Sequence, residues 1–72
     1  MENLQISLAA ARVNARMTQE DVAKEMHVSK NTVLNWEKGN VAPSFATLHA
    51  LSILYGIPIN NIFLPKTSTL SE

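Results

Sequence analysis

The stretch that most constrains the fold runs from Thr18 to Gly39 and reads TQEDVAKEMHVSKNTVLNWEKG. Thr18 is a good N-cap residue, and Asp21 three positions later gives a variant of the capping box. A helix is therefore predicted from about Gln19 to Met26. Ser29 supplies a second N-cap shortly after that helix. Two capped helices separated by so short a turn predict a helix-turn-helix, whose second helix can lie in the major groove of DNA.

The second helix of the pair is predicted over Lys30 to Lys38. Val33 and Trp36, three residues apart, would form its buried stripe. Gly39 follows at the position where a left-handed residue commonly ends a helix. His27 lies in the turn, where we expect a positive φ, a conformation that histidine tolerates better than most residues other than glycine.

The same residues carry a resemblance to a known family. The segment, followed by Pro43 and then by LHALSILYGIPINNIF, resembles the Cro- and repressor-type helix-turn-helix domain of phage and bacterial regulators, the Xre-like family. The resemblance covers about Leu4 to Leu64, and its most specific part is T-Q-x-x-x-A-x-x-x-x-V-S-x-x-T-V-x-x-W-E-x-G. It implies a lambda-repressor-like DNA-binding domain that regulates transcription, acting as a dimer on a two-fold operator.

Three further helices are predicted around this unit. A first helix, Asn3 to Arg16, follows from apolar residues that repeat at i+3 and i+4. A fourth, Phe45 to Tyr55, is capped by Ser44, and a short fifth, Ile59 to Phe63, lies between two prolines. The predicted fold class is all-α, a compact five-helix bundle without a sheet. The domain is expected over 1–64, followed by a mobile tail over 65–72.

Composition excludes several classes of function. The chain has 72 residues and no cysteine, so no disulfide framework or thiolate zinc site is expected. We expect no metal at His27 or His49, no cofactor and no small-molecule ligand. No signal peptide and no apolar run of roughly 18 residues is visible, which favours a cytoplasmic protein without a membrane span. No catalytic set or glycine-rich phosphate loop is present, so an enzyme is not predicted.

The net charge is zero, with six basic and six acidic side chains. A strongly basic domain is the usual electrostatic footprint of a DNA binder, so the balance argues against one. Affinity nevertheless depends on the charge at the contact face, and Lys30 and Lys38 stand at the two ends of the predicted recognition helix.

The outward positions of that helix suit base recognition, since asparagine can bond an adenine edge and lysine a guanine edge. The base-reading residues are predicted to be Lys30, Asn31, Thr32 and Asn35. The phosphate contacts are predicted to be Gln19, Ser29, Lys38, Asn40 and Arg16. Apart from the motif, the same side chains would be read as an ordinary solvated surface.

The resemblance further implies that Arg12 forms a structural ion pair with Glu37, and that Gln19 braces the recognition helix while touching a phosphate. From the residues alone, a solvated polar face is the ordinary interpretation of Arg12, and a phosphate contact is the alternative.

Two functions stay open at this point. The first is a sequence-specific, DNA-binding transcriptional regulator that works as a homodimer. The second is an antirepressor or antitoxin-like module on the same fold, whose main partner is another protein such as a repressor. A dimer or partner surface is predicted at Ile59, Ile62, Phe63 and Leu34.

Overall fold

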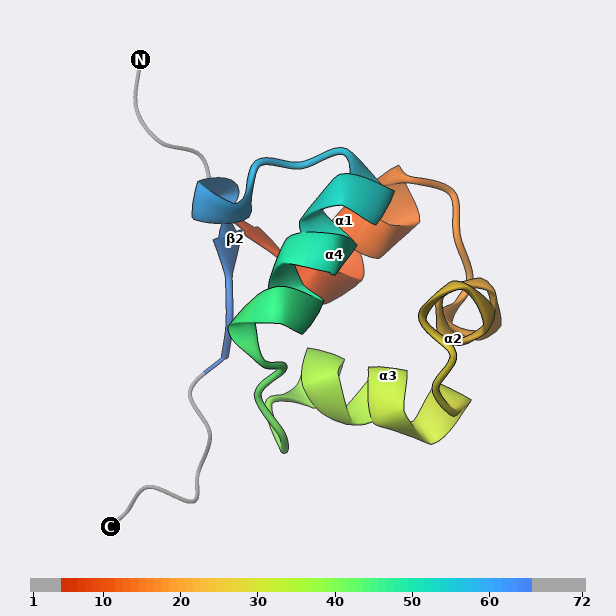
Figure 1. Ribbon diagram of the computed structural model, residues 1–72. Helices are drawn as coiled ribbons and strands as arrows, with labels where there is room; N and C mark the ends of the chain where they lie inside the picture. Colours follow the sequence, from red (N-terminus) through yellow and green to blue (C-terminus); the bar gives the residue numbers. More distant parts are fainter. Residues whose placement is uncertain (1–4, 66–72) are drawn as a thin grey trace, which may run out of the picture.

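The computed structural model describes residues 5–65, which contain four α-helices, one short 3-10 turn and two strands of two residues each (Figure 1). Their bounds are β1 Ile6–Ser7, α1 Leu8–Asn14, α2 Gln19–Met26, α3 Lys30–Lys38, α4 Phe45–Tyr55, η1 Ile59–Asn61 and β2 Ile62–Phe63. In Figure 1, α2 and α3 form one side of the molecule, and α4 packs with α1 and the strands on the other.

The bounds predicted for α2, α3 and α4 are confirmed, because the capping side chains form the bonds that their positions indicated. Thr18 Oγ1 accepts a hydrogen bond from the backbone N–H of Asp21 at 3.0 Å, and Asp21 Oδ2 accepts one from the Thr18 N–H at 2.8 Å. Ser29 and Ser44 cap α3 and α4 through their hydroxyl oxygens in the same way. Each of these helices ends at a left-handed residue.

The predicted first helix is too long. Residues 1–4 lie outside the described part of the chain, and α1 begins only at Leu8, where the Ser7 hydroxyl accepts a hydrogen bond from Ala10 N–H at 3.1 Å. Ile6 and Ser7 are extended instead of helical. The helix also ends at Asn14, two residues before Arg16, which has a φ of 61°.

The fifth helix and the absence of a sheet are also wrong for the described residues. After η1 the chain becomes extended at Ile62–Phe63, and this strand pairs in parallel with β1. The register places Ile6 beside Ile62 and Ser7 beside Phe63. The pairing carries Ile62 into the core with 7% of its surface exposed. The all-α class therefore holds with four helices, and the strand pair joins the two ends of the domain.

One hydrophobic core lies between the helices. Its buried members are Leu8, Ala11, Val22, Ala23, Val33, Trp36, Leu51, Tyr55 and Ile62. Each of the four α-helices contributes at least two of them, so the helix-turn-helix is packed on the rest of the domain. No helix within residues 5–65 combines the length and the apolar character that a membrane span requires. The predicted mobile tail lies beyond the described residues, except for Pro65.

Candidate nucleic-acid interface

The turn between α2 and α3 fixes the direction of the recognition helix. His27 has φ 58° and ψ 44°, in the left-handed region, as the sequence predicted. The next N–H, that of Val28, donates to the Ala23 carbonyl at 2.9 Å, which closes the end of α2. The next helix, α3, can therefore begin directly after Val28, with Ser29 as its N-cap. The α2–α3 pair makes the most extensive helix–helix contact in the described part of the chain.

The inner face of α3 is held by apolar and by charged contacts. Val33 and Trp36 are 1% and 7% exposed, as predicted for the buried stripe. Glu37 lies beside them, and its side chain is also only 7% exposed. A carboxylate so nearly buried requires compensation by charge and hydrogen bonds.

Arg12 supplies that compensation from α1. Its Nε lies 2.7 Å from Glu37 Oε2, and its Nη2 donates to Oε1 at 3.4 Å. Arg12 Nη1 also donates to the Met17 carbonyl at 2.9 Å, while the Arg12 side chain is 15% exposed. The predicted ion pair is therefore confirmed, and its two-point geometry ties α1 directly to α3.

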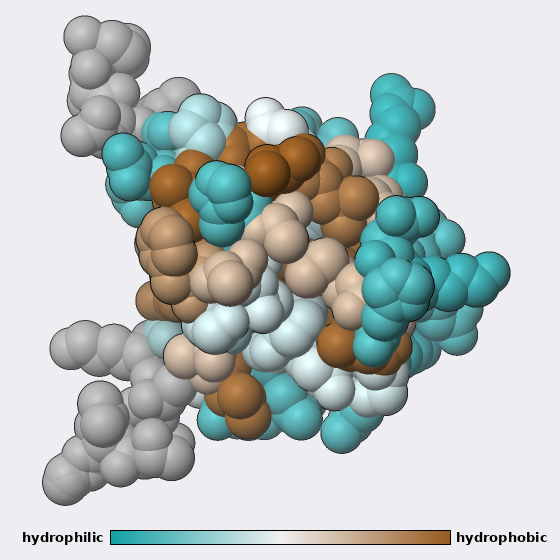
Figure 2. Space-filling model, viewed as in Figure 1, coloured by the Kyte–Doolittle hydropathy of each residue, from teal (hydrophilic) through white to brown (hydrophobic). Residues whose placement is uncertain are grey.

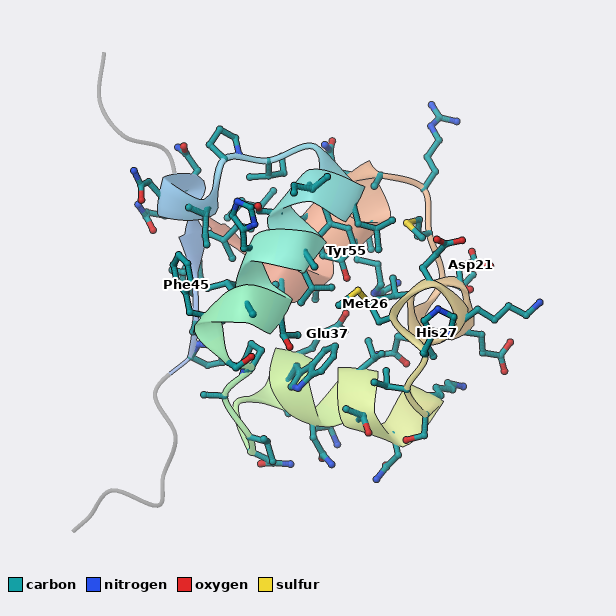
Figure 3. The ribbon with its side chains drawn as sticks, viewed as in Figure 1. Asp21, Met26, His27, Glu37, Phe45 and Tyr55 are labelled. Atoms are coloured by element: carbon teal, nitrogen blue, oxygen red, sulfur yellow. The ribbon has the colours of Figure 1, made fainter. Side chains whose placement is uncertain are left out.

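Gln19 completes this network, since its Nε2 donates to Glu37 Oε1 at 3.0 Å. The bond joins the first turn of α2 to the inner face of α3, which is the bracing contact that the resemblance implied. Tyr55 lies near the same group. The pKa of the Tyr55 phenol is raised to about 12, chiefly by burial and further by the Glu37 carboxylate, while Arg12 offsets part of the rise. Figure 3 shows both residues in the middle of the molecule, Glu37 between α3 and α4 and Tyr55 beside α4.

The outer face of α3 carries the polar side chains proposed for DNA. Lys30, Asn31 and Lys38 are exposed. Thr32 is half-buried, and its hydroxyl lies 3.0 Å from the Ser29 hydroxyl within the N-cap. Thr32 is thus partly engaged in capping the helix, which leaves its methyl group as its clearest contribution to base contact.

Asn35 and Asn40 form a second pair at the end of α3. Asn40 Nδ2 donates to Asn35 Oδ1 at 3.1 Å, and the Asn40 backbone N–H donates to the Asn35 carbonyl at 3.0 Å. An amide oxygen has two lone pairs, so Asn35 Oδ1 can still accept a bond from an adenine. The asparagine at the helix end therefore orients the one proposed to read a base, a contact that the sequence alone did not reveal.

The remaining predicted contacts lie in different settings. Ser29 and Arg16 are exposed, Ser29 at the N-cap of α3 and Arg16 in the turn two residues after α1. The predicted partner surface is scattered. Leu34 and Ile59 are half-buried, Phe63 is 46% exposed, and Ile62 belongs to the core of the monomer, so Ile62 does not lie on the surface.

Sequence reasoning missed the largest exposed apolar side chains. Phe45 and Ile53 on α4 are 73% and 69% exposed. The signal was present, because α4 has an apolar composition on all sides and not on one stripe alone. Within residues 5–65 no cluster of three potential metal ligands occurs.

Comparison with known proteins agrees with this geometry. The family described as Helix-turn-helix matches residues 8–62, and the chain belongs to this family. The Xre- and Cro-type resemblance is thereby confirmed, and this family is one of DNA-binding proteins without enzymatic activity.

The relatives are named as regulators of transcription. The cryptic phage CTXphi transcriptional repressor RstR of Vibrio cholerae is 36% identical over 61 residues, which are 85% of this chain and 55% of that protein. An HTH-type transcriptional regulator of Methanocaldococcus jannaschii is 38% identical over 48 residues, 67% of this chain and 73% of that protein. A third regulator, from Archaeoglobus fulgidus, is 32% identical over 61 residues, 85% of this chain and 86% of that protein.

The chain thus spans about half the length of the phage repressor that it matches. No solved structure matches it significantly.

Proposed function

We propose that this chain, a DNA-binding transcriptional regulator by its family, represses transcription as a homodimer that reads a two-fold operator with α3. The observation that carries the proposal is the two-sided character of α3. Val33, Trp36 and the Glu37 network fix its inner face, while Lys30, Asn31 and Lys38 stand exposed on the other. A rigidly held helix with polar outer side chains is what base reading in a major groove requires.

The proposed division of roles follows from the reach of each side chain. Lys30, Asn31, Thr32 and Asn35 would face base edges, since they lie on α3 away from the core. Gln19, Ser29, Lys38, Asn40 and Arg16 would contact phosphates around them. Such a regulator acts where the chromosome is, so we place it in the cytoplasm.

Charge at the interface is consistent with modest affinity. Residues 5–65 hold five basic and four acidic side chains, a net charge of +1. The Arg12–Glu37 pair is internal and cancels. The basic side chains left over are Arg16, Lys24, Lys30 and Lys38, against Glu20, Asp21 and Glu25. Two copies on one operator would therefore be needed to reach useful affinity.

The experiment is selection from a library of random duplexes at low salt, followed by measurement of the dissociation constant at two salt concentrations. If each copy contacts about three phosphates, a dimer loses affinity about 10³-fold between about 50 and 200 mM salt. Failure of any duplex to bind at low salt would overturn the proposal.

A second candidate is a protein-binding module on the same fold, which the exposed apolar side of α4 favours. Such a module would show negligible affinity for duplexes at moderate salt. Its complex with a protein partner would be lost in Ile53→Asp, a substitution at an exposed apolar position of α4.

A further inference from the structure

The described chain after Lys38 carries no charge. Between Gly39 and Pro65 there is no Asp, Glu, Lys or Arg, and all charged side chains of residues 5–65 lie between Arg12 and Lys38. Figure 2 shows the same division, with hydrophilic teal gathered over α2 on the right and mostly white and brown over α4. A surface helix of a monomer normally turns a charged or polar face to water, so the outer face of α4 is unusual.

On that outer face a row of large side chains lies beside a row of small ones. Phe45, His49 and Ile53, one turn apart along α4, are all exposed. The rings of Phe45 and His49 are stacked at 21° with their centroids 6.2 Å apart, and Ile53 continues the same row at i+4, so the three side chains form a ridge along the helix. Directly beside it, Ala46 and Ala50 form a parallel row of small side chains. The helix thus presents a ridge and a groove side by side, both along the i±4 direction.

We propose that a second copy of this chain docks on this face, with the Phe45–His49–Ile53 ridge of each copy lying in the Ala46–Ala50 groove of the other. The proposal specifies the interface of the homodimer inferred above, and it rests on that proposed function. Packing of i±4 ridges into i±4 grooves is a common way for two helices to cross. Alanine at the crossing point lets the two backbones approach closely.

The adjoining ridge and groove on α4 favour a second copy of this chain over a different partner. A two-fold interface must be self-complementary, because each residue that contacts a neighbour is contacted by the same residue in return. A ridge adjoining a groove of matching direction on one helix satisfies this condition by itself. The absence of charge from Gly39 to Pro65 also leaves nothing on this side to attract an acidic or basic partner.

The position of the face suits DNA reading. α4 begins only a few residues after the end of α3, across the short segment 39–44. Docking through α4 would therefore fix the spacing of the two recognition helices, which must match half-sites about one helical turn apart.

The size of the face implies a weak dimer. One aromatic, one imidazole, one large aliphatic and two alanine side chains bury roughly 400–500 Å² per copy, below the roughly 800 Å² of a standard interface. The chain should therefore be largely monomeric when dilute and pair at high concentration or on adjacent half-sites.

Cysteine cross-linking tests the geometry directly, since the chain has no cysteine of its own. Ala50→Cys places one thiol at the proposed crossing point, where the two copies come within the Cα separation that a disulfide spans, about 4.4–6.8 Å. Ala10→Cys is the matched control, an exposed alanine on α1. We expect oxidation of full-length Ala50→Cys at high concentration to give a disulfide-linked dimer at least about tenfold faster than Ala10→Cys. Equal rates would overturn the proposal.

Sedimentation of the wild-type chain over a range of concentrations provides the second measurement. Ile53→Asp should weaken self-association at least about tenfold, because it introduces a charge into an apolar contact. Val13→Asp is its control, since Val13 is 62% exposed on α1. A wild-type chain that stays monomeric at about 1 mM would overturn the proposal and leave this face for a different protein. Neither measurement contains DNA, so a failure to bind duplexes would count against the proposed function without affecting this interface.

Discussion

The two regions of this domain are stabilised by different kinds of contact. From Leu8 to Lys38, a network centred on Glu37 joins α1, α2 and α3 through Arg12 and Gln19. From Gly39 to Pro65 there is no charged side chain, and apolar contacts from α4 and β2 attach the region to the core. Polar contacts are directional, so the first region can set the orientation of α3. Apolar contacts are not directional, and the second region also carries Phe45 and Ile53, the exposed apolar side chains proposed above as a docking surface.

Breaking the charge network of the first region should have the largest effect on the stability of the domain. Arg12→Ala leaves Glu37 unpaired with its side chain 7% exposed, and we expect a loss of about 3 kcal/mol in the free energy of unfolding. Urea denaturation measures it, with Lys24→Ala as the exposed control, expected to change stability by less than about 0.5 kcal/mol. The double variant Arg12→Met with Glu37→Leu should recover part of the loss, because no charge then remains without a partner. If Arg12→Ala kept full stability and weakened DNA binding, Arg12 would be a phosphate contact after all.

Binding variants separate the two polar roles within the first region. Asn35→Ala should relax preference at one base position and cost about 1–3 kcal/mol on the best site. Lys38→Ala should weaken binding to all sequences alike, because phosphates are the same in every site. It should also reduce the slope of log affinity against log salt concentration by about 0.9. Titration of selected and scrambled duplexes measures both. Identical behaviour of the two variants would contradict the assignment.

Substitutions at the two left-handed residues that end α2 and α4 should have smaller effects on stability. His27 and Gly56 have φ of 58° and 72°, and both end a helix. His27→Gly should be neutral or stabilising by up to about 1 kcal/mol, whereas His27→Ile should destabilise by about 1–3 kcal/mol. Gly56→Ala should cost about 1 kcal/mol through φ alone, since an added Cβ would meet no atom within 4 Å. Thermal melts rank these variants, and equal stability of His27→Gly and His27→Ile would disprove a demand for positive φ.

The smallest effect is expected from acid titration of the α2 cap. Hydrogen bonds from Thr18 lower the pKa of Asp21 below its ordinary 3.8. A lowered pKa means that the cap contributes stability above pH 3.8 and loses it as the pH falls through the folded value. Asp21→Asn should therefore show a weaker loss of helicity than the wild type below that pH. Parallel curves for the two proteins, followed by circular dichroism, would show that the cap does not titrate in this way.

How far the sequence predicted the fold depended on whether a signal was local. Thr18, Ser29 and Ser44 each lie next to the helix that they begin, and the bounds of those three helices were predicted from them. The start of α1 was missed because the spacing of Leu4 and Leu8 continued the helical repeat through Ser7. The β1–β2 pair had no local signal, since two residues at each end of the domain meet only after folding.

The site shows the same limit. The outward side chains of α3 followed from the inward positions of Val33 and Trp36. The Arg12–Glu37 pair came from the family resemblance, because two residues so far apart in the sequence give no periodic signal. Arg16 at φ 61° was missed, since arginine is not a residue that marks a left-handed turn. The Asn35–Asn40 bond depends on the path of the loop after Gly39, which spacing does not determine.

The parallel pairing of Ile6 with Ile62 has a consequence for the order of events during synthesis. Ile6 is among the first residues of this domain to be translated, and its partner strand is among the last. At roughly 5–20 residues per second, the ribosome needs several seconds to add the residues between them. A chain truncated after Asn61 lacks β2 and stands in for this unfinished state. Hydrogen exchange on it would measure how well the backbone amides of Ile6 and Ser7 are protected without their partner strand. Whatever the helices do before then, the strand pair can form only after Ile62 and Phe63 have been added to the chain.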